Sequence, residues 1–192
     1  MKNLGAAMAG GHGKRREHDF YPTPEECTRA LLEAEGGRLN AMLPVWEPAC
    51  GDGAICKVLE AQGYRTVATD LIKRGYGKHD INFLDQNEAM APQIVTNPPF
   101  VLAAEFIAKG IELGVPYMAM LVKSQYWHAA RRLPLFESHA PAVVYPLTWR
   151  PDFDGRGSPT MDCSWIVWLG KPACVTEYRP LPRPPGAKDL LR

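Results

Sequence analysis

The chain has 192 residues, of which 46% are hydrophobic and 22% are charged, a composition typical of one soluble globular domain. No apolar run approaches the ~20 residues that cross a bilayer, so we expect a cytoplasmic protein without membrane association. The net charge is +1, so a nucleic acid would have to be held by local basic patches. Five cysteines form no Cys-x-x-Cys pair and the histidines show no ligand spacing with them, which predicts reduced thiols and no metal site.

Composition divides the chain into three segments. Residues 1–19 combine small residues with mixed charges and are predicted to form a flexible N-terminal arm. Residues 20–178 alternate strand-like with helix-like segments and are predicted to form the single folded domain. The tail 179–192 is rich in proline, and we expect it to wrap over the domain.

A first helix is predicted directly after residue 23. Thr23 can cap this helix, Pro24 suits its first position, and Glu26 completes a capping box. Gly36-Gly37 predicts its end. Later helices are predicted over 55–62 and 103–113, with an irregular one over 125–136.

Short β-rich or apolar segments predict the strands. They lie at 43–46, 65–70, 94–96, 117–122, 142–145 and 164–169, with an edge strand at 80–84. The alternation of these strands with helices predicts an α/β three-layer sandwich. We expect a mostly parallel seven-stranded sheet that ends in a late antiparallel hairpin, with the Rossmann-like arrangement.

The sequence Asn97-Pro98-Pro99-Phe100 follows the predicted strand 94–96 directly. Neither proline can donate to a sheet ladder, and each residue before a proline is held extended. The result is a stiff elbow that holds an amide side chain, a carbonyl and an aromatic ring in fixed relation. A plain turn after a strand is the alternative interpretation.

A glycine loop, Glu47-Pro48-Ala49-Cys50-Gly51-Asp52-Gly53, separates a strand from a helix, where α/β folds bind ligands. Its glycines let the backbone approach a ligand closely, but their spacing is not that of pyrophosphate binders. The carboxylates of Glu47 and Asp52 would repel a phosphate and suit a cationic ligand such as a sulfonium. Asp70 ends the next strand, where a carboxylate can accept from both ribose hydroxyls of a nucleoside.

These motifs together resemble one enzyme family. Tyr21-Pro22-Thr23-Pro24, the loop at 47–53 and the elbow at 97–100, in this order, are similar to S-adenosylmethionine-dependent DNA adenine-N6 methyltransferases of the small phage or prophage type. The resemblance covers roughly residues 20–170. It also includes the segment 68–77 and the late aromatic strand Ser164-Trp165-Ile166-Val167-Trp168.

The resemblance implies roles for individual residues. S-adenosyl-L-methionine would be held at its methionine end by Tyr21, Thr23, Glu47, Pro48, Ala49, Gly51 and Gly53. Its ribose would be held by Asp70 and its adenine by Ile72, Phe83 and either Asn82 or Asp85. Catalysis would fall to Asn97, Pro98, Pro99 and Phe100.

The elbow suits methyl transfer to an amino nitrogen whose lone pair is delocalised. The Asn97 side-chain oxygen and the Pro98 carbonyl would accept both amino hydrogens, which favours a more tetrahedral nitrogen aimed at the methyl group. Phe100 would stack on the base, which must be flipped out of a duplex. Methylation of adenine in RNA or of a glutamine amide in protein remains open, as does an inactive binding protein.

Little of the chain is free to read a DNA sequence. Gly53 and Asn97 are only 44 positions apart, which leaves no room for a separate target-recognition domain. The predicted DNA contacts are Lys14, Arg15 and Arg16 in the arm and Arg150 and Arg156 in the loop 146–161. This favours a short recognition site, or a homodimer or partner that completes the grip on DNA.

Overall fold

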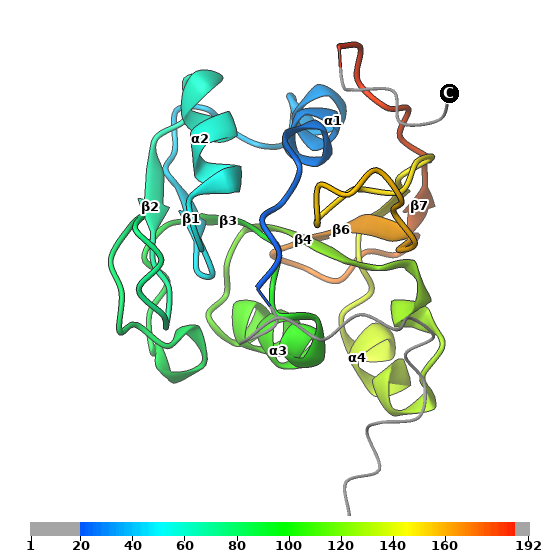
Figure 1. Cartoon of the computed structure of the whole chain (residues 1–192). Helices are drawn as coiled ribbons and strands as arrows, with labels where there is room; N and C mark the ends of the chain where they lie inside the picture. Colours follow the sequence, from blue (N-terminus) through cyan, green and yellow to red (C-terminus); the bar gives the residue numbers. More distant parts are fainter. Residues whose placement is uncertain (1–19, 187–192) are drawn as a thin grey trace, which may run out of the picture.

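A mixed seven-stranded sheet forms the centre of the protein, in a computed structural model that describes residues 20–186 (Figure 1). The strand order is β2-β1-β3-β4-β6-β5-β7. The strands are β1 Val45–Glu47, β2 Thr66–Ala68, β3 Gln93–Thr96, β4 Tyr117–Lys123, β5 Val143–Pro146, β6 Cys163–Leu169 and β7 Glu177–Tyr178. Strands β2, β1, β3 and β4 are parallel, whereas β6 runs antiparallel to both β4 and β5.

Helices cover both faces of this sheet. Helices α1 (Glu25–Glu35) and α2 (Ala54–Ala61) lie on one face, and α3 (Ala103–Glu112) and α4 (Leu133–Ser138) lie on the other (Figure 1). Within residues 20–186, four 3₁₀ turns complete the regular structure: η2 Phe83–Asp85, η3 Phe100–Leu102, η4 Ser124–Trp127 and η5 Ala130–Arg132. The predicted three-layer sandwich with a late antiparallel pairing is confirmed.

Alternation along the strands divides the core into two clusters. In β4, Ala119 and Leu121 pack with α1 and α2, while Met118 and Met120 pack with α3. This is the two-residue period of a strand whose faces are both buried. Among the described residues, no helix has the length and apolar character to cross a membrane.

Two local predictions were wrong. The segment 80–84 is not a strand; the Asn82 side-chain oxygen accepts from the Leu84 N–H at 3.1 Å, and this contact caps the 3₁₀ turn η2. The seventh strand is instead β7, which pairs with β5 at the opposite edge of the sheet. Helix α1 has Pro24 rather than Thr23 at its N-cap position and no side-chain capping bond, so the capping box does not form.

The segment after β7 lies along β5 and α1. Leu181 is buried and forms a bridge with Leu147, and the Arg183 guanidinium binds the Glu26 carboxylate at 3.0 Å. Residues 179–186 therefore pack on the domain. The remainder of the predicted tail and the predicted arm 1–19, with Lys14, Arg15 and Arg16, lie outside the described residues.

Candidate active site

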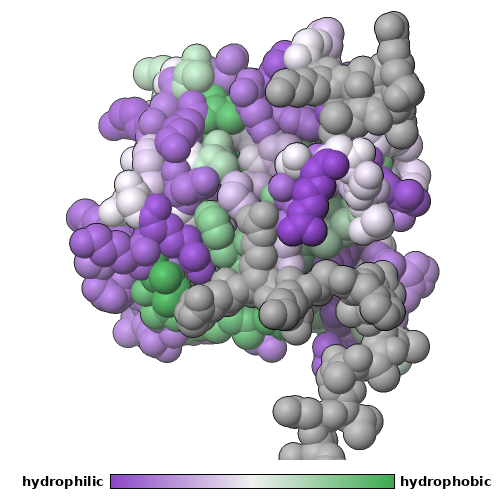
Figure 2. Space-filling model, viewed as in Figure 1, coloured by the Kyte–Doolittle hydropathy of each residue, from purple (hydrophilic) through white to green (hydrophobic). Residues whose placement is uncertain are grey.

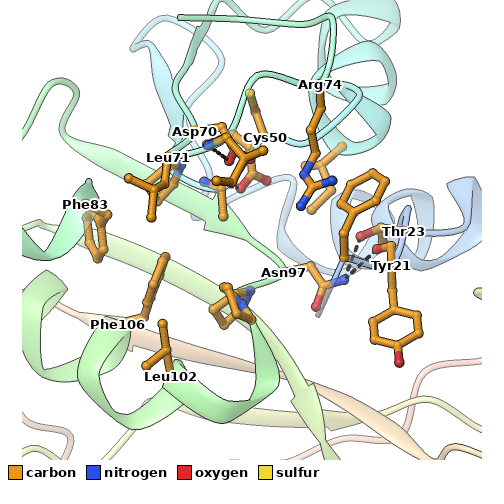
Figure 3. Close-up of a pocket in the computed structure, with 18 of the residues that line it drawn as sticks. Tyr21, Thr23, Cys50, Asp70, Leu71, Arg74, Phe83, Asn97, Leu102 and Phe106 are labelled. Carbon is orange, nitrogen blue, oxygen red and sulfur yellow. Dashed lines mark hydrogen bonds between the residues drawn. The ribbon is translucent and has the colours of Figure 1, made fainter. Parts of the chain in front are cut away.

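A pocket of about 430 Å³ opens at the carboxyl ends of β1, β2 and β3 (Figure 3). Parallel strands bring their ends together at one edge, so the residues that follow each strand meet there. The pocket walls come from the N-terminal segment 20–23, the loop after β1, the loop after β2 and the elbow after β3. Val101 and Leu102, which precede α3, line the pocket and are exposed. Figure 2 shows hydrophobic surface along the lower part of the protein in this view.

The amide of Asn97 is held by the N-terminal segment. Its Nδ2 donates to the Thr23 hydroxyl at 3.0 Å and to the Tyr21 carbonyl at 3.4 Å (Figure 3). Its Oδ1 is buried and has no hydrogen-bond partner within residues 20–186. No described residue therefore uses the capacity of this carbonyl oxygen to accept hydrogen bonds.

Phe100 lies within an aromatic group that the sequence does not predict. Its ring stacks on Tyr21, with a centroid distance of 6.1 Å and an interplanar angle of 28°. Phe153, from the loop between β5 and β6, meets both rings edge-on. The Lys123 ammonium lies 5.0 Å from the centroid of the Phe100 ring.

Glu47 places a buried carboxyl at the end of β1. Its Oε1 accepts from the Ala49 N–H at 3.2 Å and from the Thr96 hydroxyl, whereas Oε2 has no partner within the described residues. Burial raises the pKa of Glu47 to about 8, and its two hydrogen bonds oppose this rise only in part. A cationic ligand beside Oε2 would favour the ionised form.

Asp70 joins the loops that follow β1 and β2. Its Oδ2 accepts from the Gly51 N–H at 2.8 Å, and its Oδ1 accepts from the Ile72 N–H at 2.7 Å. Gly51 has a φ of +56°, and a Cβ there would lie 2.3 Å from Cε2 of Phe20. This close approach explains why glycine is needed at position 51.

The far end of the pocket is apolar. Leu71, Phe83, Leu102 and Phe106 lie around it and come from three separate segments, because η3 runs directly into α3 (Figure 3). Asn82 lines the pocket beside them, and its Nδ2 donates to the Asp85 carboxylate at 2.8 Å. Of the two alternatives in the sequence, Asn82 therefore borders the pocket, and Asp85 lies behind it.

Most of the predicted site residues meet at this pocket. Its lining includes Tyr21, Thr23, Glu47, Pro48, Ala49, Asp70, Ile72, Asn82, Phe83, Asn97, Pro98, Pro99 and Phe100. Gly51 and Gly53 do not line it; they accommodate the rings of Phe20 and Tyr76 respectively. Both glycines shape the loop and do not form the pocket wall.

Sequence reasoning missed several lining residues. Phe20, Leu71, Arg74, Ile81, Leu102 and Phe106 also line the pocket. The Arg74 guanidinium lies 4.2 Å from the centroid of the Phe20 ring. Phe20 and Leu71 are next to predicted site residues in the sequence, and this adjacency could have indicated them. The contact of Arg74 with Phe20 forms only in the folded chain, so no sequence pattern indicates it.

The loop 146–161 contains both buried and exposed candidates for substrate contact. Arg150 pairs with Asp162 at 2.8 Å, and Arg156 is exposed near the loop tip. Trp149 is buried in the core. Both arginines predicted to contact DNA are thus exposed, and Arg150 is held by an ion pair with Asp162.

Solved structures share this fold. A Pyrococcus horikoshii protein provisionally described as an RNA methyltransferase is 14% identical, with a TM-score of 0.65 over 83% of this chain and 91% of that one. A Listeria monocytogenes protein, provisionally a class I S-adenosylmethionine-dependent methyltransferase, is 13% identical, with a TM-score of 0.62 over 94% and 69%. A Vibrio vulnificus protein, provisionally a type I restriction enzyme's modification subunit, is 14% identical, with a TM-score of 0.57 over 88% and 49%.

The sequence itself has no comparable match. No protein-family profile matches the chain, and no curated protein matches it significantly. The chain spans about half the length of the modification subunit. At these low identities the likeness concerns the fold, and the chain has the Rossmann-like fold of these methyltransferases, as its strand and helix pattern predicts.

Proposed function

We propose that this protein transfers a methyl group from S-adenosyl-L-methionine to the N6 amino group of adenine in DNA. The observation that carries the proposal is the Asn97 amide at the pocket wall. Its Oδ1 is buried and unpartnered among the described residues, while its Nδ2 is already bound. Such an oxygen needs an N–H donor from a ligand, and an exocyclic amino group supplies one.

The pocket has the chemistry that S-adenosyl-L-methionine requires. This cofactor supplies an electrophilic methyl group on a positively charged sulfur. Glu47, Asp52 and Asp70 line the pocket and provide carboxyl groups for its ammonium and ribose hydroxyls. The unpartnered Oε2 of Glu47 is the buried polar atom that fits the ammonium. Leu71, Ile72 and Phe83 would enclose its adenine.

The elbow would prepare the substrate nitrogen for methylation. Asn97 Oδ1 and the Pro98 carbonyl accept its two hydrogens, which draws the lone pair out of conjugation with the ring. Phe100 stacks on the base and fixes its orientation. These residues act by positioning and by electrostatic stabilisation and form no covalent intermediate.

DNA is the proposed polymer because the Tyr21-Pro22-Thr23-Pro24 segment is similar to that of DNA methyltransferases. The fold is also that of a protein described as a restriction-enzyme modification subunit, although a protein described as an RNA methyltransferase shares it too. Arg156 and Arg150 are the proposed contacts to DNA within residues 20–186, and Lys14, Arg15 and Arg16 are proposed contacts in the arm. A second copy of the chain would extend this small surface.

Methyl transfer to defined polymers tests the proposal. The protein is incubated with methyl-labelled S-adenosylmethionine and DNA, RNA or protein, in parallel with Asn97→Ala. We expect label in DNA as N6-methyladenine, and a loss of at least a hundredfold in rate with Asn97→Ala.

The matched control for this variant is Asn40→Ala. Among the described residues, the Asn40 side chain bonds only to the Met42 N–H, at a turn outside the pocket lining, so its loss should leave the rate unchanged. Label that enters RNA or protein, but not DNA, would overturn the choice of polymer. Absence of label in all three would overturn the proposed activity.

A further inference from the structure

Thr23 has a structural position that its sequence context does not predict. It precedes α1, yet its side chain caps nothing, and the residue is only 7% exposed. Its hydroxyl accepts instead from Asn97 Nδ2 at 3.0 Å, although the two residues are 74 positions apart in the chain. A buried hydroxyl that a distant amide binds in this way has a role beyond starting the helix.

The hydrogen bonds of this amide determine which way it faces. The Tyr21 carbonyl can only accept, so the group near it must be the NH₂ of Asn97. Thr23 binds the same NH₂ at the shorter distance, and the pair of acceptors places Oδ1 on the opposite side. A rotated amide would bring Oδ1 against the Tyr21 carbonyl oxygen and lose that bond, so the Tyr21 carbonyl selects the orientation and the Thr23 hydroxyl, at the shorter distance, holds it in place.

We propose that Thr23 is a positioning residue that fixes the Asn97 amide with Oδ1 ready to accept from the substrate amino group. This inference rests on the proposed function of Asn97. Thr23 acts through Asn97, so removing its hydroxyl should slow the methylation step and leave cofactor binding intact. The competing role is a direct contact to the cofactor, because Thr23 also lines the pocket.

Thr23→Val tests the inference, because valine keeps the shape of threonine and cannot accept a hydrogen bond. The Tyr21 carbonyl, at 3.4 Å, is then the only acceptor that holds the amide. We expect kcat to fall about tenfold, the effect of one lost hydrogen bond, while the Kd for S-adenosylmethionine measured by calorimetry is unchanged. Thr23→Ser retains the hydroxyl and should recover most of kcat.

Thr28→Val is the matched control. Thr28 is fully buried in α1, and its hydroxyl has no hydrogen-bond partner within the described residues. The same chemical change there should leave both kcat and the Kd for the cofactor unaltered. An equal loss of kcat in both valine variants would show a general effect of the substitution and overturn the inference.

NMR spectroscopy tests the contact between Thr23 and Asn97 in a second way, which does not require activity. The side-chain ¹H–¹⁵N signals of Asn97, assigned by their loss in Asn97→Ala, should move in Thr23→Val and stay in place in Thr28→Val. Unmoved Asn97 signals in Thr23→Val would overturn the inference. A raised Kd for the cofactor with unchanged kcat would also overturn it and assign Thr23 to cofactor binding. Moved signals in a protein without methyltransferase activity would overturn the proposed function alone.

Discussion

Glu47 keeps a carboxyl group at a place from which water is almost fully excluded, with 1% of the residue exposed. Desolvation raises its pKa from an ordinary 4.5 to about 8 because the bonds from Thr96 and Ala49 replace only part of the lost hydration. Without a ligand, the group is thus mainly protonated at neutral pH. The cost of burying a charge is avoided until a cation arrives to balance it.

Glu47→Gln should remove a pH-dependent loss of stability. The unfolded carboxyl ionises near pH 4.5 and the folded one near pH 8, so the stability that this proton contributes is complete below pH 4.5 and is lost as the pH rises towards 8. Each pH unit within that window costs up to about 1.4 kcal/mol. As the pH rises from 4.5 to 8, the Tm of the ligand-free wild type should therefore fall relative to the Tm of Glu47→Gln. Parallel Tm curves across the window would contradict the raised pKa.

The loop between β1 and α2 depends on contact with the N-terminal segment. A Cβ on Gly51 would meet the Phe20 ring at 2.3 Å, whereas one on Gly63, after α2, would meet no atom within 4 Å. Both glycines have a positive φ, so both would incur the backbone strain of a non-glycine residue there. Alanine substitutions at these two glycines therefore separate the effect of backbone strain from the effect of contact with the Phe20 ring.

Gly51→Ala should weaken the binding of S-adenosylmethionine at least tenfold, because the displaced Phe20 ring is part of the pocket wall. Gly63→Ala is the control and should lower the Tm through backbone strain without changing the affinity. Calorimetric titration and thermal unfolding of both variants measure the two effects. Equal affinities would show that Phe20 moves aside without consequence for the site.

The features that could be predicted from the sequence are those determined by residues close together in the chain. The two prolines after Asn97 end β3 whatever surrounds them, and Asp70 follows a β-rich segment, so both positions could be predicted from the sequence. The role of Thr23 could not be predicted from the sequence, because its hydroxyl binds Asn97 in the folded protein and does not cap the helix. Phe153 reaches the elbow from a loop more than 50 residues away, and no local pattern indicates such a contact.

The net charge of +1 gives the whole molecule no strong field for a polyanion. Affinity for DNA would then depend on a few local contacts, and the dependence of log Kd on log salt would be shallow. Arg156→Gln should reduce that slope by about 0.9, the value for one phosphate contact. Lys171→Gln, another exposed cation, is the control and should leave the slope as it is in the wild type. Equal slopes in the two variants would exclude Arg156 as a contact.

The segment around β7 also determines where the sheet ends. The carbonyls of Ala142, Val144 and Pro146 along β5 accept from the N–H groups of Glu177, Arg179 and Leu181 at 2.8–3.0 Å. An apolar strand such as β5, left with these groups unpaired, is a template on which another chain can add a strand. Residues 177–181 occupy that template from within the same chain. A second copy of the protein therefore cannot pair directly with β5 unless this segment first detaches.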